Sequence, residues 1–553
     1  MQHACANSWC RAQFEIFPED REMLRKFDCP EPIHCPDCRH QQRAMFSPAL
    51  VLYERKSSLS GAPLISVYHP SKSFPLYSIQ EWWSDAWDAL AYGREFDSGK
   101  TFFEQFGDLF SRVPKMANFS ESGENSDYCT SAANAKNCYY CRTVHRSQDC
   151  YYSELVTGYN EMLCDCLRCQ RSGWLYECVQ CVHCHSGAYL FRCHETRDSF
   201  FCTDLRGCSN CLFCTNLRNK SYYIHNAPVS REEFARAKEA ALDGRFVTLE
   251  RSLGEFGTVY TQTIWQNLNN VNCENCTGDN LANCSNAYEC FHCFNLMDCR
   301  YCWWLSPSEQ CSTSMDLTRG GIGELLYNSA GLGGGNYFIR MSASCRKSRD
   351  LTYCIDCYEC NNCFGCTGLR HKEFCVLNKQ YSKEEYQKLT SRIIEHMKKE
   401  GVWGTFFPVM LSSFPYNDSS ADILFPLSRD EVLQRGWEWA KPMPQHFEES
   451  TRSGVPDAVD DVQDTICQEV FSCEETGRKF KIILPELRFY RKMHVPLPRL
   501  HPDVRIKRRR SMLNPCRLFS RSCKKCAQPI QTSYPPERKE IVYCEKCYLE
   551  AVY

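Results

Sequence analysis

The chain has 553 residues, of which 43% are hydrophobic and 13% aromatic, and this composition excludes a wholly disordered protein. The formal net charge is -2, so a strongly charged partner would have to bind a local part of the chain. No run approaches the roughly 18 consecutive apolar residues that span a membrane, and the first residues lack the basic and apolar regions of a secretory signal. We therefore predict a cytoplasmic protein whose 42 cysteines are thiols or metal-bound thiolates rather than disulfides.

Residues 1–80 are predicted to form an N-terminal zinc-ribbon module. The segment contains two cysteine pairs, Cys5 with Cys10 and Cys35 with Cys38. Each pair places two sulfurs on one side of a tight turn, and two such pairs complete a tetrahedron around zinc. These four cysteines are therefore predicted metal ligands.

The centre of the chain is predicted to be a duplicated, cysteine-rich repeat. A shift of 152 residues aligns 193–234 with 345–386, including their cysteines. Each copy ends in a predicted helix that begins with a capping box. The two capping boxes are Ser230 to Glu233 and Ser382 to Glu385.

The spacing of the central cysteines is regular. Within each segment most of them share one register modulo three, and steps of nine residues recur, as at 184, 193, 202 and 211. A nine-residue period with short turns predicts a β-solenoid whose interior is filled by cysteine and aromatic side chains. Two alternatives stay open for these cysteines: several chelated zinc ions, or an iron–sulfur cluster.

Residues 467–553 are predicted to be a second copy of the N-terminal module. A shift of 466 residues aligns 14–82 with 480–548 without a gap. The matching residues include prolines and tyrosines, which rarely agree at one offset by chance. Two arginine pairs also match, Arg39 with Arg505 and Arg43 with Arg509.

The two copies differ in their metal ligands. The C-terminal copy contains the strongest motif of the chain, a Cys-x2-Cys-x17-Cys-x2-Cys quartet formed by Cys523, Cys526, Cys544 and Cys547. The equivalent N-terminal residues cannot hold zinc together; they are Ser57, Ser60, Ser78 and Glu81. Conversely, the first C-terminal site lacks most of its cysteines. A weaker metal site could still gather there from Cys467, Cys473 and His501.

Positive charge is concentrated in the C-terminal module, where sixteen Lys and Arg lie between Arg478 and Lys525 against two acidic residues. A basic face on a zinc ribbon is typical of proteins that bind a phosphate backbone. We predict nucleic acid, RNA more than DNA, as the partner. The alternative is a solvated basic face neutralised by the acidic segment 448–464. The predicted nucleic-acid contacts are Arg505, Lys507, Arg508, Arg509, Arg510, Arg521, Lys524 and Lys525.

Catalytic motifs are missing from the sequence. It contains no nucleophile elbow, metalloprotease helix, dinucleotide fingerprint or zinc-deaminase pattern. We therefore predict a non-enzymatic protein, and no small-molecule substrate or membrane partner is indicated. Two other functions stay open: a protein-interaction scaffold that uses the solenoid surface, and a thiol-redox, metal-buffering or iron–sulfur protein.

Four motifs occur together in one group of proteins. They are Cys35-Pro-Asp-Cys38-Arg39, Trp82-Trp83-Ser-Asp85-Ala-Trp87-Asp88, Asn378-Lys379-Gln380-Tyr381-Ser382 and Val542-Tyr543-Cys544. Through them the chain resembles uncharacterised cysteine-rich zinc-ribbon proteins from metagenomic genomes of candidate-phyla bacteria. The resemblance spans most of the chain and implies a bacterial cytosolic setting. It implies no activity, substrate or partner.

The predicted fold is mostly β with short helices, with terminal duplicated zinc-ribbon modules flanking a two-unit, cysteine-rich β-solenoid-like repeat. The predicted function is a scaffold that binds at least two zinc ions and associates with nucleic acid. The predicted domains are the N-terminal zinc-ribbon module (1–80), a helical aromatic connector (81–120), solenoid unit 1 with its helix (121–247), solenoid unit 2 with its helix (248–402), an aromatic and acidic linker (403–466) and the C-terminal basic zinc-ribbon module (467–553).

Overall fold

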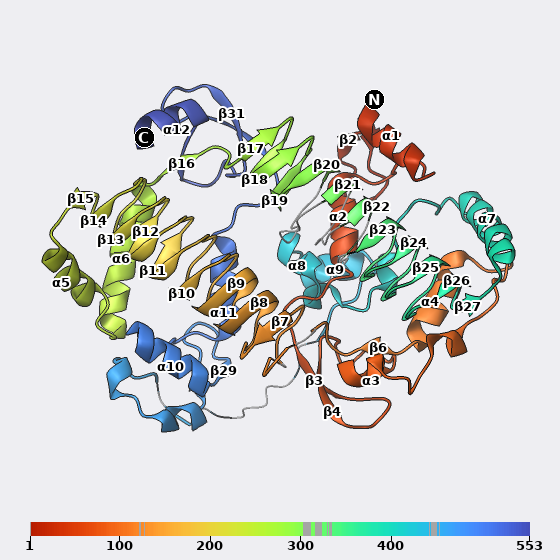
Figure 1. Cartoon of the computed structure of the whole chain (residues 1–553), viewed down its shortest axis with the longest axis horizontal. Coiled ribbons are helices and arrows are strands. Elements are labelled where there is room, and N and C mark those ends of the chain that lie inside the picture. The colour runs from red at the N-terminus through yellow and green to blue at the C-terminus, as the bar shows by residue number, and fades with distance from the viewer. Residues whose placement is uncertain are drawn as a thin grey trace. The chain divides into compact units, whose positions relative to one another are not determined.

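The computed structural model consists mostly of β-strands, with twelve α-helices among the described residues (Figure 1). It divides into two compact units, each assembled from two separate stretches of chain. Unit 1 comprises Met1–Asn118 and Asn269–Lys441, and unit 2 comprises Phe119–Leu268 and Pro442–Tyr553. The N-terminal module therefore shares a unit with the second half of the central repeat, and the C-terminal module shares a unit with the first half.

The structure describes the chain except for residues 1, 121–122, 127, 302–310, 316–322, 329, 331–334, 442, 444–448, 450 and 453. Of residues 311–315 and 323–327 it describes the backbone alone. Cys302, which belongs to the predicted cysteine register, lies outside the described residues.

Each unit contains one long sheet whose strands largely follow chain order (Figure 1). The sheet of unit 2 comprises β7 (Ala133–Lys136), β8 (Arg142–Tyr151), β9 (Glu154–Cys164), β10 (Gly173–Tyr176), β11 (His185–Phe191), β12 (Arg197–Thr203), β13 (Ser209–Leu212), β14 (Ser221–Ile224) and β15 (Ala227–Pro228). The sheet of unit 1 comprises β17 (Val271–Glu274), β18 (Gly278–Ser285), β19 (Cys290–Phe294), β20 (Leu296–Arg300), β21 (Cys311–Met315), β22 (Gly323–Tyr327), β23 (Asn336–Arg340), β24 (Arg349–Thr352), β25 (Asn361–Phe364), β26 (Glu373–Val376) and β27 (Lys379–Gln380). In both sheets the described pairs are parallel except for the last one, which is an antiparallel hairpin.

Most neighbouring parallel strands are related by a step of twelve residues. Arg197 of β12 pairs with Ser209 of β13, which pairs with Ser221 of β14, and the same step relates β24, β25 and β26. The nine-residue period predicted from the cysteine spacing is therefore wrong as the strand repeat. The step of nine instead joins cysteine thiols to carbonyl oxygens, as between Cys184 Sγ and the carbonyl of Cys193 at 3.3 Å.

The register of three among the cysteines follows from the backbone. In the strand-forming regions most third residues have φ near +50°, and the residue that follows is usually buried. Glu195 and Phe201, for example, have φ of +52°, and each is followed by a buried residue, Thr196 and Cys202. Because one buried position follows each left-handed residue, cysteines that occupy these positions are separated by multiples of three.

Helices follow the terminal hairpin of each sheet. In unit 2 these are α5 (Arg231–Ala241) and α6 (Phe246–Gln262), and in unit 1 the helix is α7 (Lys383–Lys399). Both predicted capping boxes are confirmed, since the Ser230 and Ser382 hydroxyls accept hydrogen bonds from the backbone N–H groups three residues later. Helix α6 was not predicted; it packs against β12.

The two terminal modules have the same order of elements. The N-terminal module contains β1 (Gln2–Ala4), β2 (Gln13–Glu15), α1 (Pro18–Lys26), α2 (Pro36–Ala44), β3 (Tyr53–Lys56), β4 (Pro63–Ser66), β5 (Leu76–Tyr77) and α3 (Ile79–Trp83). The C-terminal module contains β28 (Phe471–Ser472), β29 (Lys479–Phe480), α10 (Leu484–Met493), α11 (Pro502–Ser511), β30 (Phe519–Ser522), β31 (Pro529–Thr532), β32 (Ile541–Tyr543) and α12 (Glu545–Val552). The starts of α1 and α10, α2 and α11, and α3 and α12 each differ by 466 residues, the offset of the sequence duplication.

The aromatic segment after α3 packs against the sheet of unit 1. It contains a 3-10 helix, η1 (Ala89–Tyr92), α4 (Phe102–Arg112) and β6 (Lys115–Met116), and β6 pairs with β5. The ring of Phe102 in α4 lies 5.4 Å from that of Phe364 in β25. The aromatic side chains of this segment thus belong to the core of unit 1.

The described parts of the predicted linker 403–466 are folded. In unit 1 they form η2 (Val409–Leu411), η3 (Tyr416–Asp418), α8 (Ser420–Leu424) and α9 (Arg429–Gln434). Tyr416 is fully buried there and accepts a hydrogen bond from Gln41 of α2 at 2.8 Å. In unit 2 the segment continues with η4 (Val459–Asp461) and η5 (Asp464–Gln468).

Candidate metal centres

The first cysteine quartet joins a hairpin to the start of a helix. Cys5 follows β1, Cys10 lies in the turn before β2, and Cys35 is the residue that precedes α2. Cys38 lies in the first turn of α2, so Cys35 and Cys38 point to the same end of that helix. The four sulfur atoms lie within 4.8 Å of one another.

The sulfur separations fit a tetrahedral metal site. The Sγ atoms of Cys10 and Cys35 are 3.7 Å apart. The edge of a tetrahedron with metal–sulfur bonds of about 2.3 Å is about 3.8 Å, whereas the sulfurs of a disulfide are separated by about 2.0 Å. The quartet is thus arranged to bind one metal ion with its four sulfurs.

The second quartet is built in the same way. Cys523 and Cys526 lie in the turn between β30 and β31, Cys544 precedes α12, and Cys547 lies in its first turn. The four sulfurs again lie within 4.8 Å of one another, with 3.8 Å between Cys526 Sγ and Cys544 Sγ. The prediction that each of these quartets could bind a metal ion is confirmed.

In each quartet a backbone N–H group donates a hydrogen bond to one of the sulfurs. The Cys35 N–H donates to Cys5 Sγ at 3.3 Å, and the Cys544 N–H donates to Cys523 Sγ at 3.2 Å. Although burial opposes ionisation of Cys523, backbone N–H groups led by that of Cys526 lower the pKa of its thiol to about 6. A thiolate is the form that binds metal.

At the equivalent N-terminal positions, hydrogen bonds connect the residues that replace the cysteines. Ser57 Oγ donates to Glu81 Oε2 at 2.6 Å, and the Ser78 N–H donates to the same oxygen at 2.8 Å. Burial opposes ionisation of Glu81, but hydrogen bonds from Ser57, Ser60 and Ser78 lower the pKa of its carboxyl group to about 2. A hydrogen-bonded carboxylate thus occupies the place of a thiolate cluster.

The weaker site predicted in the C-terminal module is not assembled. The ligand atoms of Cys467, Cys473 and His501 do not gather within 4.8 Å of one another. His501 precedes α11, where its Nδ1 accepts a hydrogen bond from the Asp503 N–H at 3.1 Å. Burial lowers the pKa of His501 to about 4. His501 therefore serves as the N-cap of α11 in this structure.

Among the described residues, only the two quartets bring three or more His, Cys or carboxylate ligand atoms together. Most cysteines of the two sheets are buried, with their thiols near carbonyl oxygens. Cys141 Sγ, for example, lies 3.2 Å from the carbonyl oxygen of Cys150. A thiol that donates to a carbonyl oxygen retains its proton, whereas a metal ligand must lose it.

Two of the predicted nucleic-acid contacts, Arg505 and Arg509, are buried in unit 2. Both form ion pairs with Asp165, which follows β9, and Arg505 also lies 3.5 Å from Glu486 of α10. Each arginine has only 4% of its surface exposed. The positions of Arg505 and Arg509 give no support to the prediction that they contact nucleic acid, because their charges neutralise carboxylates inside the protein.

The other predicted basic contacts lie nearer the surface, and most of them have intramolecular partners. Half-buried Arg510 pairs with Glu154 of β9, and half-buried Arg521 donates to the carbonyls of Pro535 and Glu540. Exposed Arg508 and Lys525 pair with Glu475 and Glu550. Lys507 and Lys524 are also exposed.

Sequence reasoning missed the acidic partners of these arginines. Asp165 and Glu154 lie in the first half of the central repeat, more than 300 residues from α11 in the sequence. One signal was present: Arg39 and Arg43 match Arg505 and Arg509 at the duplication offset, although the N-terminal module has no comparable basic run. Arginines shared by both copies favour a structural role in each.

Fold and site together define a cysteine-rich, mostly β protein with two four-cysteine clusters that can bind metal. No protein-family model matches the chain, and no curated protein matches it. Within the part of the chain that the structure describes, every helix is too short or too polar to cross a membrane.

Proposed function

We propose that the chain is a non-enzymatic scaffold protein in which two zinc ions hold the terminal modules in shape. The observation that carries the proposal is the arrangement of two four-cysteine quartets with sulfurs at tetrahedral spacing. Zinc fits these donors because it takes four thiolates in a tetrahedron and is not redox-active. Each ion connects a hairpin to the first turn of a helix, which is a structural role.

The proposal includes a β-solenoid interpretation of the two sheets. Its support is the twelve-residue step between strands in chain order, together with further parallel bridges at the same step outside the named strands, such as His194 with Arg206. Each coil would bury one residue in three, and cysteine suits these positions because it is small and easily buried. The central thiols then serve packing, and their hydrogen bonds to carbonyls favour this role over an iron–sulfur cluster.

Elemental analysis of the purified full chain tests the metal part of the proposal. We expect two zinc ions per chain, one of which is lost in Cys38→Ser and the other in Cys547→Ser. The control Cys467→Ser, at a position outside both quartets, should retain two. A chain with bound iron and visible colour, or with no tightly bound metal, would overturn the proposal.

For the partner we retain nucleic acid, RNA more than DNA, but with a smaller contact surface. Lys507, Arg508, Lys524 and Lys525 are exposed cations of the C-terminal module, and phosphate groups could displace the surface ion pairs of Arg508 and Lys525 at modest cost. The support is that Lys524 and Lys525 lie between Cys523 and Cys526, two ligands of the C-terminal quartet. A bound metal ion would hold the backbone there rigid.

A salt titration of RNA binding by the full chain tests this partner. The isolated C-terminal module is unsuitable for this test, because it lacks Asp165, the acidic partner of Arg505 and Arg509 that follows β9. We expect Lys507→Glu with Lys524→Glu to weaken binding and to reduce the salt dependence. The matched charge reversal Lys220→Glu with Arg236→Glu, at exposed positions of unit 2, should bind like the wild type. Equal binding by both double variants would reject the surface.

A further inference from the structure

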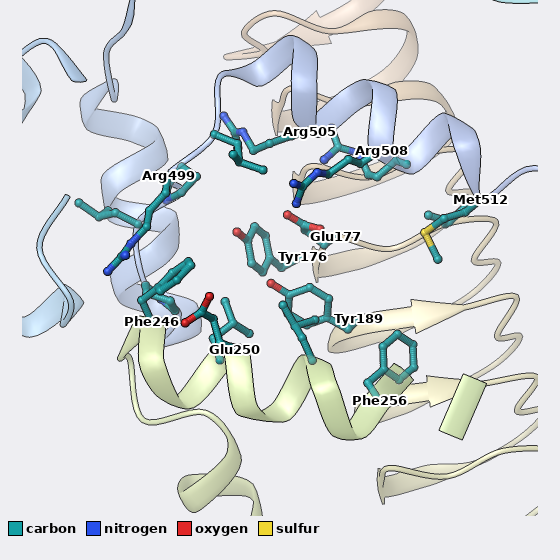
Figure 2. Close-up of a pocket in the computed structure, with 18 of the residues that line it drawn as sticks. Tyr176, Glu177, Tyr189, Phe246, Glu250, Phe256, Arg499, Arg505, Arg508 and Met512 are labelled. Carbon is teal, nitrogen blue, oxygen red and sulfur yellow. The ribbon is translucent and has the colours of Figure 1, made fainter. Parts of the chain in front are cut away.

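Unit 2 contains a cavity of about 460 Å³ that lies outside the metal sites and shares only Arg508 with the proposed basic surface. Its floor is formed by β10, β11 and the turn between them, one wall by α6, and the other by α11 with the segment that precedes it (Figure 2). This volume is within the usual range for small-molecule sites in proteins. The walls are largely apolar and aromatic, with Phe246 and Phe256 on the α6 side.

The polar groups without strong protein partners in this cavity are mostly acidic. Glu177 rises from the floor between the two walls, beside the ring of Tyr176 (Figure 2). Its carboxylate makes no hydrogen bond or ion pair with any described residue, and neither does that of Glu250 on α6. Burial, followed by the charge of Asp165, raises the pKa of Glu177, although the charges of Arg509, Arg505 and Arg508 oppose this rise. A bound group that shares the Glu177 charge would therefore relieve an unfavourable burial.

Two tyrosines add hydroxyl groups and ring faces to the same space. Tyr176 and Tyr189 have 2% and 6% of their surface exposed, and their ring centroids lie 5.6 Å apart. Figure 2 shows both rings in the space between α6 and the wall formed by α11, with the Tyr189 ring nearer to α6. Burial raises the pKa of both hydroxyls, so they remain neutral donors and acceptors.

The arginines of the cavity wall, in contrast, already have acidic partners. Arg499 lies 3.4 Å from Glu474 and stacks on the ring of Phe246, and Arg508 lies 2.7 Å from Glu475. Arg505 and Arg509 both pair with Asp165. An anionic ligand would have to compete with these carboxylates and would also meet Glu177 and Glu250.

We propose that this cavity binds an organic cation, a protonated amine attached to a flat apolar body, with the ammonium group at Glu177 and the body between the aromatic walls. The ammonium group would pair with the Glu177 carboxylate and contact the faces of the tyrosine rings, which attract cations. The apolar body would contact Leu249 and Phe256 and bury the exposed part of Leu253. This binding activity does not involve the metal sites, and its cavity shares only Arg508 with the proposed nucleic-acid surface.

Calorimetric titration of the full, zinc-loaded chain with three matched probes tests the proposal. The probes are tryptamine, its neutral analogue tryptophol and its anionic analogue indole-3-acetate, which share one ring system and differ in charge. We expect saturable binding of tryptamine, binding of tryptophol that is weaker by about tenfold, and no binding of indole-3-acetate. Absence of tryptamine binding, or indole-3-acetate binding as tight as that of tryptamine, would overturn the proposal.

Glu177→Gln locates the site. This variant keeps the size of the side chain, and we expect it to weaken tryptamine by about tenfold and to leave tryptophol unchanged. The control Glu239→Gln removes an exposed carboxylate of α5, outside the cavity, and should bind tryptamine like the wild type. Unchanged tryptamine affinity in Glu177→Gln would mean that the cation binds elsewhere. Thermal unfolding of each variant without probe checks that its fold is retained.

Discussion

Units 1 and 2 attach their terminal modules through similar contacts. In unit 1, Asp20 of α1 accepts a hydrogen bond from the hydroxyl of Tyr301, which follows β20. In unit 2, Glu486 occupies the same place in α10 and accepts one from Tyr152, which follows β8. A buried carboxylate bonded to a tyrosine of the sheet is therefore common to both docking contacts.

The charges of the second helix differ between the units. Arg43 of α2 donates to the neutral side chain of Asn328 at 2.7 Å, whereas its counterpart Arg509 lies 2.7 Å from the carboxylate of Asp165. The next position is Ala44 in α2 and Arg510 in α11. Arg510 adds an ion pair to Glu154. The basic run of α11 thus reflects a more highly charged docking contact.

A simple duplication would give both terminal modules the same metal sites, but each module has a different one. The N-terminal module retains the first quartet and the C-terminal module retains the second, yet each hairpin and helix of the changed sites is still present. The backbone of a metal knuckle can therefore persist after its ligands are replaced. Docking contacts and metal ligands have changed independently in the two copies.

Removing one ligand of the C-terminal quartet should give the largest effect. Cys547→Ser is expected to lose one of the two metal ions and, with it, the amide-exchange protection of α12. This helix has eight residues and is too short to be stable without the metal knuckle. Hydrogen exchange and elemental analysis measure the two losses. The control is Glu81→Ser at the equivalent N-terminal position, which should keep both metals, and two metals in Cys547→Ser would contradict the assignment of the quartet.

Removing a buried arginine should have the next largest effect. Arg505→Ala leaves Asp165 and Glu486 buried with one cation fewer and should reduce the stability of unit 2 by about 3 to 5 kcal/mol. Urea denaturation followed by hydrogen exchange in α10 measures this loss. Lys507→Ala, an exposed position of the same helix, should change the stability by less than about 0.5 kcal/mol. An Arg505→Ala chain that is stable but no longer binds RNA would restore the nucleic-acid role of this residue.

The stability of unit 2 should depend on pH through Glu154. Burial opposes its ionisation, but the charges of Arg510 and Arg142 lower the pKa of Glu154 from 4.5 to about 2. A lowered pKa stabilises the fold above pH 4.5, by about 3 kcal/mol for this difference, and the contribution is lost as the pH falls toward 2.

The measurement is urea denaturation of the wild type and Glu154→Gln between pH 6 and pH 2. The wild type should be more stable at pH 6, and the difference should disappear near pH 2. Metal loss in acid affects both chains alike, so it does not remove the difference. A gap that stays constant over this range would show that the Glu154 charge is not what stabilises the contact.

The sequence predicts local features of this fold well because they depend on short-range physics. Residue spacing alone indicates the four-cysteine quartets, the capping boxes and the duplication at an offset of 466 residues. The structure contains all three. The strand repeat was predicted wrongly, since cysteine occupies only some buried positions. The nine residues from Cys184 to Cys193 cover three successive buried positions, each three residues apart. Paired positions on neighbouring strands are twelve residues apart.

Long-range pairing could not be read in the same way. Nothing local in the sequence indicates that Arg505 faces Asp165, because the two residues are separated by 340 positions and neither is unusual by itself. The cavity beside Glu177 was missed for a similar reason. One of its walls is α6, a helix without a capping box whose apolar residues were assigned to the start of the second repeat.

The smallest effect is expected where hydrogen bonds have replaced a metal. Glu81→Gln keeps the shape of the side chain but removes the charge that accepts hydrogen bonds from Ser57 and Ser78. Because Glu81 and Ser78 are only half-buried, we expect a loss of about 1 kcal/mol, much less than the loss caused by Cys547→Ser at the equivalent position. Urea denaturation of the two variants, with hydrogen exchange read in α3 and α12, gives the comparison directly. The prediction is contradicted if Glu81→Gln unfolds α3 as fully as Cys547→Ser unfolds α12. The carboxylate would then stabilise its turn and helix as much as the metal does.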